Sequence, residues 1–377
     1  MAEIYTSSEV ATLGQLSQDA TDHINSVLAD LGLTGTSSIA VQTEAGRVQA
    51  DAGDVAVVAM PGADGSTVVD VGAEPVAVIL AGSGTVEIEG SGGATVFASA
   101  DGNSVTAGAG DATLHGGAGA DSLSGGLGGG NHTLVAAGAG DTLAGGLGMD
   151  TLWGSDTGAS LLVGGANGQT EMHAGLAGGD TIRSSGGLDT IYGGNATIYA
   201  SGHSATIHAD GDTIRASGDG ATIDGSASAH ALQVDGSGSF ATILGGAGND
   251  TIMLHDSHGG GNFASGGEGA DHFTGSLAGG DTLDGGAGDD SFQTYGGFDS
   301  VIGGDGSDHF AILGYGIGHD TLDGGAGDDT AWFSDRTSTD AQIRHSGLTT
   351  LVTFDDGYSA SLNGIENLQF KDTVLAG

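Results

Sequence analysis

The chain has 377 residues, of which 78 are glycine, two are proline and none is cysteine, and its formal net charge is −42 because 48 acidic residues face six basic ones. Without clustered positive charge it offers no binding surface for nucleic acid or for an anionic membrane. Without cysteine the fold cannot depend on disulfides or thiolate metal sites. No apolar run is long enough to span a bilayer, and no basic segment followed by an apolar run marks a signal peptide at the start.

Residues 1–35 predict one amphipathic helix that begins at the hydroxyl residues Thr6, Ser7 and Ser8 and stops at Gly32. The apolar residues that recur at helical spacing are Val10, Leu13, Ala20, Ile24, Val27, Leu28 and Leu31. Two roles are open for this helix: a cap packed on the first coils of a solenoid, or an assembly element. Because terminal repeats need cover, we favour the cap.

Residues 36–110 predict the irregular start of a β-solenoid, because short β-branched segments alternate with glycine-containing turns. The expected strands are 39–41, 55–58, 67–69, 76–80, 85–88 and 95–97. Pro61 and Pro75 are expected at turns or strand starts, since proline would delete a ladder hydrogen bond inside a central strand.

Residues 111–335 predict a parallel β-roll, because an aliphatic or aromatic residue returns about every nine positions. Units this short bury no core alone and must stack on their neighbours. The expected fold class is all-β, a right-handed parallel β-roll or β-helix solenoid with a short N-terminal helix. The expected inward residues are Leu114, Leu123, Leu143, Leu152, Ile182, Ile191, Ile207, Ile214, Ile223, Ile243, Ile252, Phe273, Leu283, Phe292, Val301, Phe310 and Leu322.

A nonapeptide, G-G-x-G-x-D-x-U-x with U a large apolar residue, recurs inside this periodicity. Its copies begin at Gly116, Gly145, Gly245, Gly266, Gly285, Gly303 and Gly324, the last with the small Ala331 at U. Shortened versions place further aspartates in the intervening turns. Residues 159–240 keep the period but lack the full turn, so we expect few or no calcium sites there.

These turns predict calcium sites, because Ca²⁺ takes six to eight oxygen ligands from carboxylates and backbone carbonyls. Glycine turns expose carbonyls, and stacking one coil on the next brings two half-sites together. Turn-forming propensity alone explains a few copies but not their constant internal spacing. The predicted ligands of multiple Ca²⁺ ions are Gly117, Gly119, Asp121, Asp141, Gly146, Gly148, Asp150, Gly246, Gly248, Asp250, Gly267, Gly269, Asp271, Asp281, Gly286, Gly288, Asp290, Asp299, Gly304, Gly306, Asp308, Asp320, Gly325, Gly327 and Asp329.

The nonapeptides resemble the haemolysin-type calcium-binding repeats of RTX (repeats-in-toxin) proteins from Gram-negative bacteria. The resemblance implies a β-roll with Ca²⁺ between successive turns and export by type I secretion machinery through an uncleaved C-terminal signal. Segments 351–357 and 362–368 are similar to the stretch that often follows the last repeats. Residues 336–377 are therefore expected to form a C-terminal β cap and secretion-signal segment.

We find no enzyme motif: H-E-x-x-H and G-x-S-x-G are both absent. The segment His255-Asp256-Ser257-His258 is interpreted as a solvated turn rather than a transition-metal site. The favoured function is a secreted structural protein of the cell surface or extracellular matrix, such as a biofilm component or adhesin, that folds on binding calcium. Such a protein is expected to self-associate into filaments or layers. The alternative is an accessory protein that binds or modifies cell-surface polysaccharide through residues 39–240.

Overall fold

The computed structural model describes residues 3–6, 9, 16–33, 38–42, 46–50, 56–59, 66–165, 169–255, 260–313 and 317–377. The chain forms two compact units, residues 1–192 and 193–377, and each is nearly all β. Pro61, Ser7, Ser8, Val10, Leu13, Val55 and the segment 256–258 lie outside the described residues.

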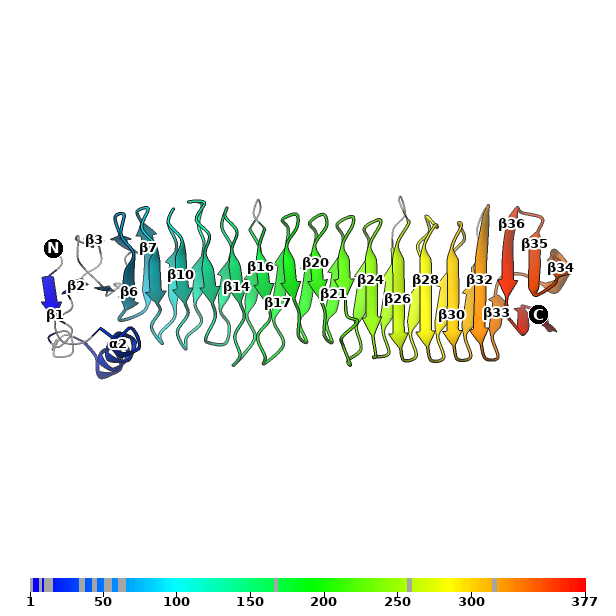
Figure 1. The fold of residues 1–377 in the computed structure, drawn as a ribbon, viewed down its shortest axis with the longest axis horizontal. Helices are drawn as coiled ribbons and strands as arrows, with labels where there is room; N and C mark the ends of the chain where they lie inside the picture. Colours follow the sequence, from blue (N-terminus) through cyan, green and yellow to red (C-terminus); the bar gives the residue numbers. More distant parts are fainter. Residues whose placement is uncertain are drawn as a thin grey trace. The chain divides into compact units, whose positions relative to one another are not determined.

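Unit 1 (residues 1–192) is a parallel β-solenoid in which even-numbered and odd-numbered strands form two separate sheets (Figure 1). Strand β1 (Glu3–Thr6) pairs antiparallel with β2. The even strands are β2 (Ser38–Gln42), β4 (Ala56–Ala59), β6 (Val76–Leu80), β8 (Ala94–Phe97), β10 (Ala112–His115), β12 (Thr133–Val135), β14 (Thr151–Trp153), β16 (Glu171–His173) and β18 (Thr190–Tyr192). The odd strands are β3 (Arg47–Gln49), β5 (Ser66–Asp70), β7 (Gly84–Glu89), β9 (Asn103–Thr106), β11 (Ser122–Ser124), β13 (Thr142–Ala144), β15 (Leu161–Val163) and β17 (Thr181–Ser184).

The strands are short because each coil needs only one inward side chain per strand. Leu114 of β10 pairs with Leu134 of β12, and Leu134 pairs with Leu152 of β14, so identical residues stack from coil to coil. All three are fully buried, and their neighbours in each strand face outward. The predicted inward residues are all buried in the structure, which confirms the predicted solenoid.

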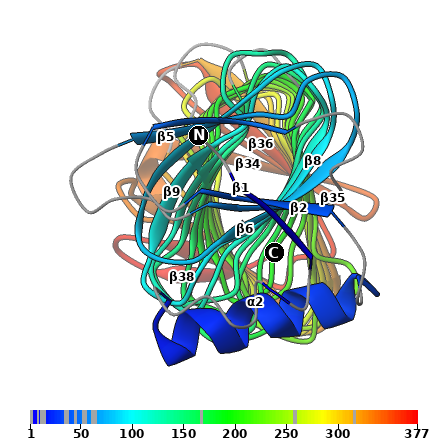
Figure 2. The ribbon, with the colours of Figure 1, turned by 90° about the vertical axis from the view of Figure 1, so that its left-hand side faces the viewer.

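Helix α2 (Gln18–Asp30) begins at Ser17, whose hydroxyl accepts the backbone N–H of Ala20. Its apolar face, Ile24, Val27 and Leu28, packs on the outward residues of β2 and β6, and Figure 2 shows it lying along the first coils. This contact agrees with the predicted packing on the first coils. Of the predicted helix start, Thr6 is corrected, because it belongs to β1 and its backbone pairs with β2 instead; Ser7 and Ser8 lie outside the described residues, and Glu9 is helical.

The N-terminal strand predictions coincide with β2, β4, β5, β6, β7 and β8 within the described residues. Strands β3 and β9 were not predicted, because each holds only one buried aliphatic residue between polar neighbours. Pro75 immediately precedes β6, as expected of a residue that cannot donate to the ladder.

Unit 2 (residues 193–377) repeats this architecture with longer strands toward its C-terminal end (Figure 1). One sheet contains β20 (Thr206–His208), β22 (Thr222–Asp224), β24 (Thr242–Gly246), β26 (Phe263–Glu268), β28 (Thr282–Ala287), β30 (Ser300–Asp305), β32 (Gly318–Ala326) and β36 (Tyr358–Asn363). The other contains β19 (Thr197–Ala200), β21 (Thr213–Ala216), β23 (Gln233–Gly236), β25 (Thr251–Leu254), β27 (His272–Thr274), β29 (Ser291–Thr294), β31 (His309–Ile312), β33 (Thr330–Phe333) and β37 (Asn367–Phe370).

The core of unit 2 contains a stack of phenylalanines from consecutive coils. The ring centroids of Phe273 and Phe292 lie 4.9 Å apart, and those of Phe292 and Phe310 lie 5.0 Å apart, with nearly parallel planes. Ala331 follows Phe310 in the same column and is fully buried. The weak apolar position of the last nonapeptide is therefore still a core position.

Residues 336–377 fold back onto the last coils. A 3₁₀ turn (Ser338–Asp340) leads into β34 (Ala341–Ser346), which pairs antiparallel with β35 (Thr349–Phe354); β35 in turn pairs antiparallel with β36. Strands β36 and β37 continue the parallel ladders of β32 and β33, and β38 (Val374–Ala376) closes the chain against β37. The guanidinium carbon of Arg336 lies 4.0 Å from the ring centroid of Phe354.

Candidate calcium-binding turns

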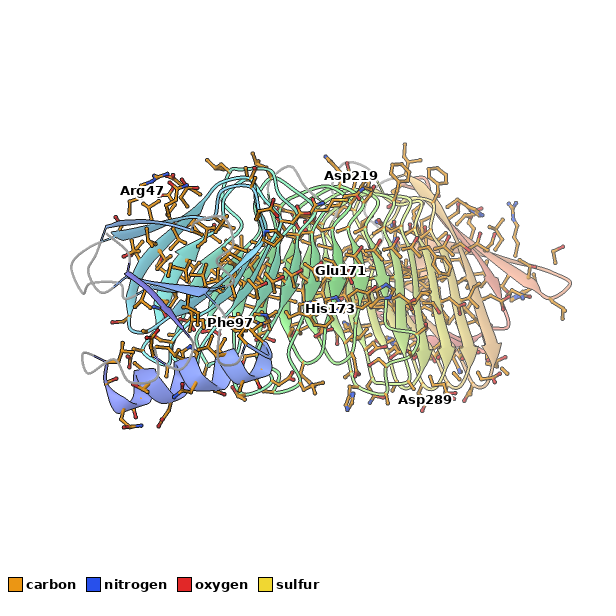
Figure 3. The ribbon with its side chains drawn as sticks, turned by 60° about the vertical axis from the view of Figure 1, so that its left-hand side comes forward. Arg47, Phe97, Glu171, His173, Asp219 and Asp289 are labelled. Carbon is orange, nitrogen blue, oxygen red and sulfur yellow. The ribbon has the colours of Figure 1, made fainter. Side chains whose placement is uncertain are left out.

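The nonapeptide turns of unit 2 lie on one edge of its solenoid, which we call the Gly–Asp edge. It consists of the turns that lead from an even strand to the next odd strand, 245–250, 266–271, 285–290, 303–308 and 324–329. Figure 3 labels Asp289 on this edge and Asp219, from a turn of the other kind, on the opposite edge.

The aspartates that end these turns form a ladder along the edge. The Oδ1 atom of Asp271 accepts the backbone N–H of Asp250 at 2.7 Å, and Asp290 accepts the N–H of Asp271 at 2.7 Å. The ladder continues in the same way: Asp308 Oδ1 accepts the N–H of Asp290 at 2.8 Å, and Asp329 Oδ1 accepts the N–H of Asp308 at 2.7 Å. One carboxylate oxygen of each residue is thus occupied by the preceding coil.

The second carboxylate oxygen of each ladder residue has no partner. The Oδ2 atoms of Asp250, Asp271, Asp290, Asp308 and Asp329 are buried and make no hydrogen bond, and the same holds for Asp299 on the opposite edge. Their residues are at most 2% exposed. A buried ionised oxygen without a donor is costly unless a cation compensates it. We call a turn with such an oxygen an open turn.

Backbone carbonyls from the next coil point into the same spaces. A Cβ atom placed on Gly266 would collide with Asp271 Oδ2 and lie 2.9 Å from the Gly285 carbonyl oxygen. Gly285 has the same surroundings, with Asp290 Oδ2 and the Gly303 carbonyl oxygen. Gly245 and Gly303 have the corresponding two oxygens around them: the Oδ2 atom of the aspartate that ends the turn and a carbonyl oxygen of the next coil. We call each of these glycine-lined spaces a cradle. Its nearest polar atoms are two oxygen acceptors, and oxygen is the ligand atom that a hard cation such as Ca²⁺ takes.

Glycine is required in these turns because the backbone enters the left-handed region. Gly267, Gly286, Gly304 and Gly325 have φ between 95° and 114°, a range that side chains rarely allow. Gly269, Gly288, Gly306 and Gly327 also have positive φ, as does Gly246, whereas Gly248 does not. Gly267, Gly286, Gly304 and Gly325 pair with one another in the parallel ladder, so the strands extend into the turns.

Burial raises the pKa of the open carboxyls, and for all of them except Asp250 the charges of neighbouring carboxylates raise it further. The pKa reaches about 6 for Asp271 and Asp308, and about 7 for Asp290 and Asp299. The pKa values of Asp250 and Asp329 are also raised, again chiefly by burial. A bound cation would favour the ionised forms and lower these pKa values again.

The predicted ligands of unit 1 have different surroundings. The Oδ2 atom of Asp121 accepts the Gly117 N–H at 2.6 Å, Asp141 accepts from Ala137 at 2.9 Å and Gly138 at 3.1 Å, and Asp150 accepts from Gly146 at 2.5 Å. Gly117, Gly119, Gly146 and Gly148 are not among the glycines with positive φ. We call these closed turns, because the Oδ2 atom already accepts a hydrogen bond, whereas in an open turn it has no partner.

In the unit 1 turn 145–150 the next coil also presents a different atom. A Cβ atom on Gly145 would have as its nearest neighbour the backbone nitrogen of Gly165, at 3.0 Å, where the open turns present a carbonyl oxygen. The central aspartates are closed as well: Asp180 accepts from Gly175, Asp189 from Ser184, and in unit 2 Asp212 from Asp210.

Two further predicted ligands of unit 2, on the opposite edge, are closed. Asp281 Oδ2 accepts the N–H and the hydroxyl of Ser276, and Asp320 Oδ2 accepts the hydroxyl of Tyr358 at 2.6 Å. The serine at the start of the turn 276–281 is a visible departure from the motif. Unit 1 offers no such sign, because its copies match the motif as well as the open ones do.

Sequence reasoning missed the residues that take an aspartate's place in the ladders. Asn262 accepts the Ala241 N–H, and the hydroxyls of Ser160 and Thr170 accept N–H groups within their own turns. All stand two residues before an inward side chain, as the aspartates do. That constant offset is the signal by which they could have been found.

Among the described residues, no three His, Cys, Asp or Glu side chains group together as a metal cluster. The stacked coils and glycine–aspartate turns define a parallel β-solenoid repeat protein. A family model described as RTX calcium-binding nonapeptide repeat (4 copies) matches residues 97–131, 134–157, 174–196, 235–255, 276–310 and 316–332.

The chain therefore carries several RTX repeats, a calcium-binding motif, and fits a calcium-binding repeat protein. No curated protein matches it. None of the helices in the described part of the chain is long and apolar enough to cross a membrane. The family match spans open and closed turns alike, so the difference between them comes from the structure alone.

Proposed function

We propose that the protein is a secreted, calcium-binding structural protein of the cell surface or extracellular matrix, and that it takes up calcium mainly along the Gly–Asp edge of unit 2. The observation that carries this proposal is the row of buried, unpartnered carboxylate oxygens facing backbone carbonyls. Catalysis is not part of the proposal.

The residues would act together in the following way. Asp250, Asp271, Asp290 and Asp308 would each give Oδ2 to an ion shared with the first-glycine carbonyl of the next turn, and calcium would supply the positive charge that the edge lacks. Oδ1 keeps the coils in register through the ladder bonds. Because the cradles exist only in the folded state, ion binding stabilises that state by mass action.

This coupling suits a protein that folds after export. In a compartment with little calcium the charged edge opposes the folding of unit 2, which would keep that unit extended for the type I machinery that the repeats suggest. Outside, extracellular calcium modules operate at dissociation constants of about 10⁻⁴ to 10⁻³ M. The unpaired strand edges at the ends of a parallel solenoid would then allow self-association into filaments or layers.

Unit 1 would form the calcium-independent part of this design. Its carboxylates already accept backbone N–H groups. Asp121, Asp141 and Asp150 stay predicted ligands, but each would first have to break those bonds. We therefore expect unit 1 to hold its coils in chelator.

The test is a calcium titration of the full, chelator-treated chain, followed by circular dichroism, light scattering and hydrogen exchange resolved by segment. We expect protection of residues 242–333 to rise cooperatively with calcium while residues 94–163 change little, and scattering to rise with assembly. Magnesium at equal ionic strength is the control, because it demands tighter octahedral geometry and dehydrates reluctantly. Equal protection of 242–333 in chelator and calcium would refute the proposal.

A second candidate function, saccharide binding, is favoured by one groove in unit 2. A cavity of ≈ 310 Å³ opens on the outer face of β19, β21 and β23, lined by Tyr199, Arg215, Asp235 and serines. Arg215 is the only Lys or Arg between residues 184 and 335, and its Nε lies 3.9 Å from Asp235 Oδ2. A guanidinium beside an amphipathic ring suits a saccharide carboxylate. If Arg215→Gln and the control Arg344→Gln bind a uronate polysaccharide equally, the groove has no such role.

A further inference from the structure

The Gly–Asp edge does not end with its last nonapeptide. After the turn 324–329, the next segment on this edge is 363–367, between β36 and β37. Glu366 Oε2 accepts the N–H of Asp329 at 2.9 Å, just as Asp329 Oδ1 accepts the N–H of Asp308 at 2.7 Å. Glu366 also stands two residues before the buried Leu368. It therefore occupies the next rung of the aspartate ladder.

Gly364 takes the place of the next turn's first glycine. A Cβ atom on Gly324 would collide with Asp329 Oδ2 and with the Gly364 carbonyl oxygen, the same pair of acceptors that surrounds Gly245, Gly266, Gly285 and Gly303. Gly364 has φ 59°, which turns this carbonyl toward the cradle at little cost. Asp329 is 0% exposed, and its Oδ2 has no hydrogen-bond partner.

Two amide side chains hold this segment against the last turn. Asn363 Nδ2 donates to Asp323 Oδ1 at 3.1 Å, and Asn367 Nδ2 donates to Asp328 Oδ1 at 2.8 Å. These bonds lie on both sides of the cradle and bring the two segments together there. Asp328, Asp329 and Glu366 each accept a hydrogen bond in this segment, and none of the donors is a basic side chain.

We propose that residues 324–329 and 363–367 form a further calcium site, completed by the C-terminal cap, with Asp329, Glu366 and the Gly364 carbonyl as ligands. The proposal rests on the proposed calcium function. It goes further in making the ion a clamp that fastens residues 358–377 to the roll. On the opposite edge the cap closes the ladder without an ion, through the Tyr358 hydroxyl on Asp320.

The test compares the full wild-type chain with Glu366→Gln. Glutamine keeps an oxygen for the Asp329 N–H but loses the charge. Glu87→Gln is the matched control, since Glu87 is exposed on β7 and loses the same charge. Bound calcium is counted by equilibrium dialysis with radioactive calcium, and hydrogen exchange follows residues 358–377. Loss of even an outer-shell partner lowers metal affinity roughly 10–100-fold.

We expect Glu366→Gln to bind one calcium ion fewer at subsaturating calcium, and the midpoint for protecting residues 358–377 to rise at least roughly ten-fold, with residues 263–312 and Glu87→Gln unchanged. An equal count and midpoint would overturn this inference while leaving the proposed function intact. A cap less protected than wild type already in chelator would also overturn it, because Glu366 would then act through its hydrogen bond. If wild type binds no calcium, the proposed function itself fails.

Discussion

Replacing Asp290 with asparagine should change stability in opposite directions with and without calcium. Asparagine keeps Oδ1 for the N–H of Asp271, so the ladder bond survives. It replaces the unpartnered Oδ2 with an NH₂ group that faces the Gly303 carbonyl. The substitution thus supplies a donor where wild type needs a cation.

The size of the effect follows from the raised pKa. Burial raises the pKa of Asp290 from 3.8 to about 7, so holding it ionised in the metal-free fold costs about 4 kcal/mol. A neutral asparagine avoids this cost, but imperfect hydrogen bonding of its buried amide costs roughly 1–3 kcal/mol. We expect Asp290→Asn to stabilise unit 2 by about 1–3 kcal/mol in chelator at a pH above 7. At calcium near 100 times the dissociation constant it should lose about 2.7 kcal/mol of linked stabilisation.

The assay is urea denaturation of the full chain in chelator and in calcium, with hydrogen exchange of residues 282–294 to separate unit 2 from unit 1. Asp289→Asn is the control, because Asp289 is exposed, carries the same charge and accepts only the Ser307 N–H. A loss of stability in both conditions, or an unchanged calcium dependence, would refute the assignment of Oδ2 as a ligand.

Three further predictions concern pH, the closed turns and the core. The open carboxyls whose pKa is raised to about 6 or 7 bind more protons in the folded state than in the unfolded state. Without calcium, the stability of unit 2 should therefore fall as pH rises from about 4 through 7 and level off above. A free energy of unfolding in chelator that stays constant over this range would contradict the prediction. Asp121→Asn would set an NH₂ group against the Gly117 N–H and cost unit 1 about 1–3 kcal/mol of stability, equally with and without calcium. Segment-resolved hydrogen exchange measures this cost. A cost seen only with calcium would make the turn a metal site. Phe292→Ala would break the phenylalanine stack and cost unit 2 about 3–5 kcal/mol, with residues 94–163 as the internal reference for the same exchange measurement; a loss below about 1 kcal/mol would show that the stack is not a tightly packed core.

Most of the coil architecture could be predicted from the sequence, because a solenoid is built from local repeats. One inward residue per strand sets the register, as the pairing of Ile198 with Ile214 and of Phe273 with Phe292 shows. The 16-residue coils of the central region could be predicted by the same rule. The N-terminal helix was harder, since its first predicted turn has polar residues that serve a strand equally well, and Thr6 pairs in β1.

The sequence by itself determined the period, the inward residues and the aspartates available to a cation. Only the tertiary structure decided which aspartates are left without a donor. Asp121 and Asp290 end turns that both match the nonapeptide, yet one Oδ2 accepts a turn N–H while the other faces carbonyls. The reason is physical: a carboxylate's partners depend on the φ angles of its turn and on the atom the next coil presents, and both are set by stacking between coils.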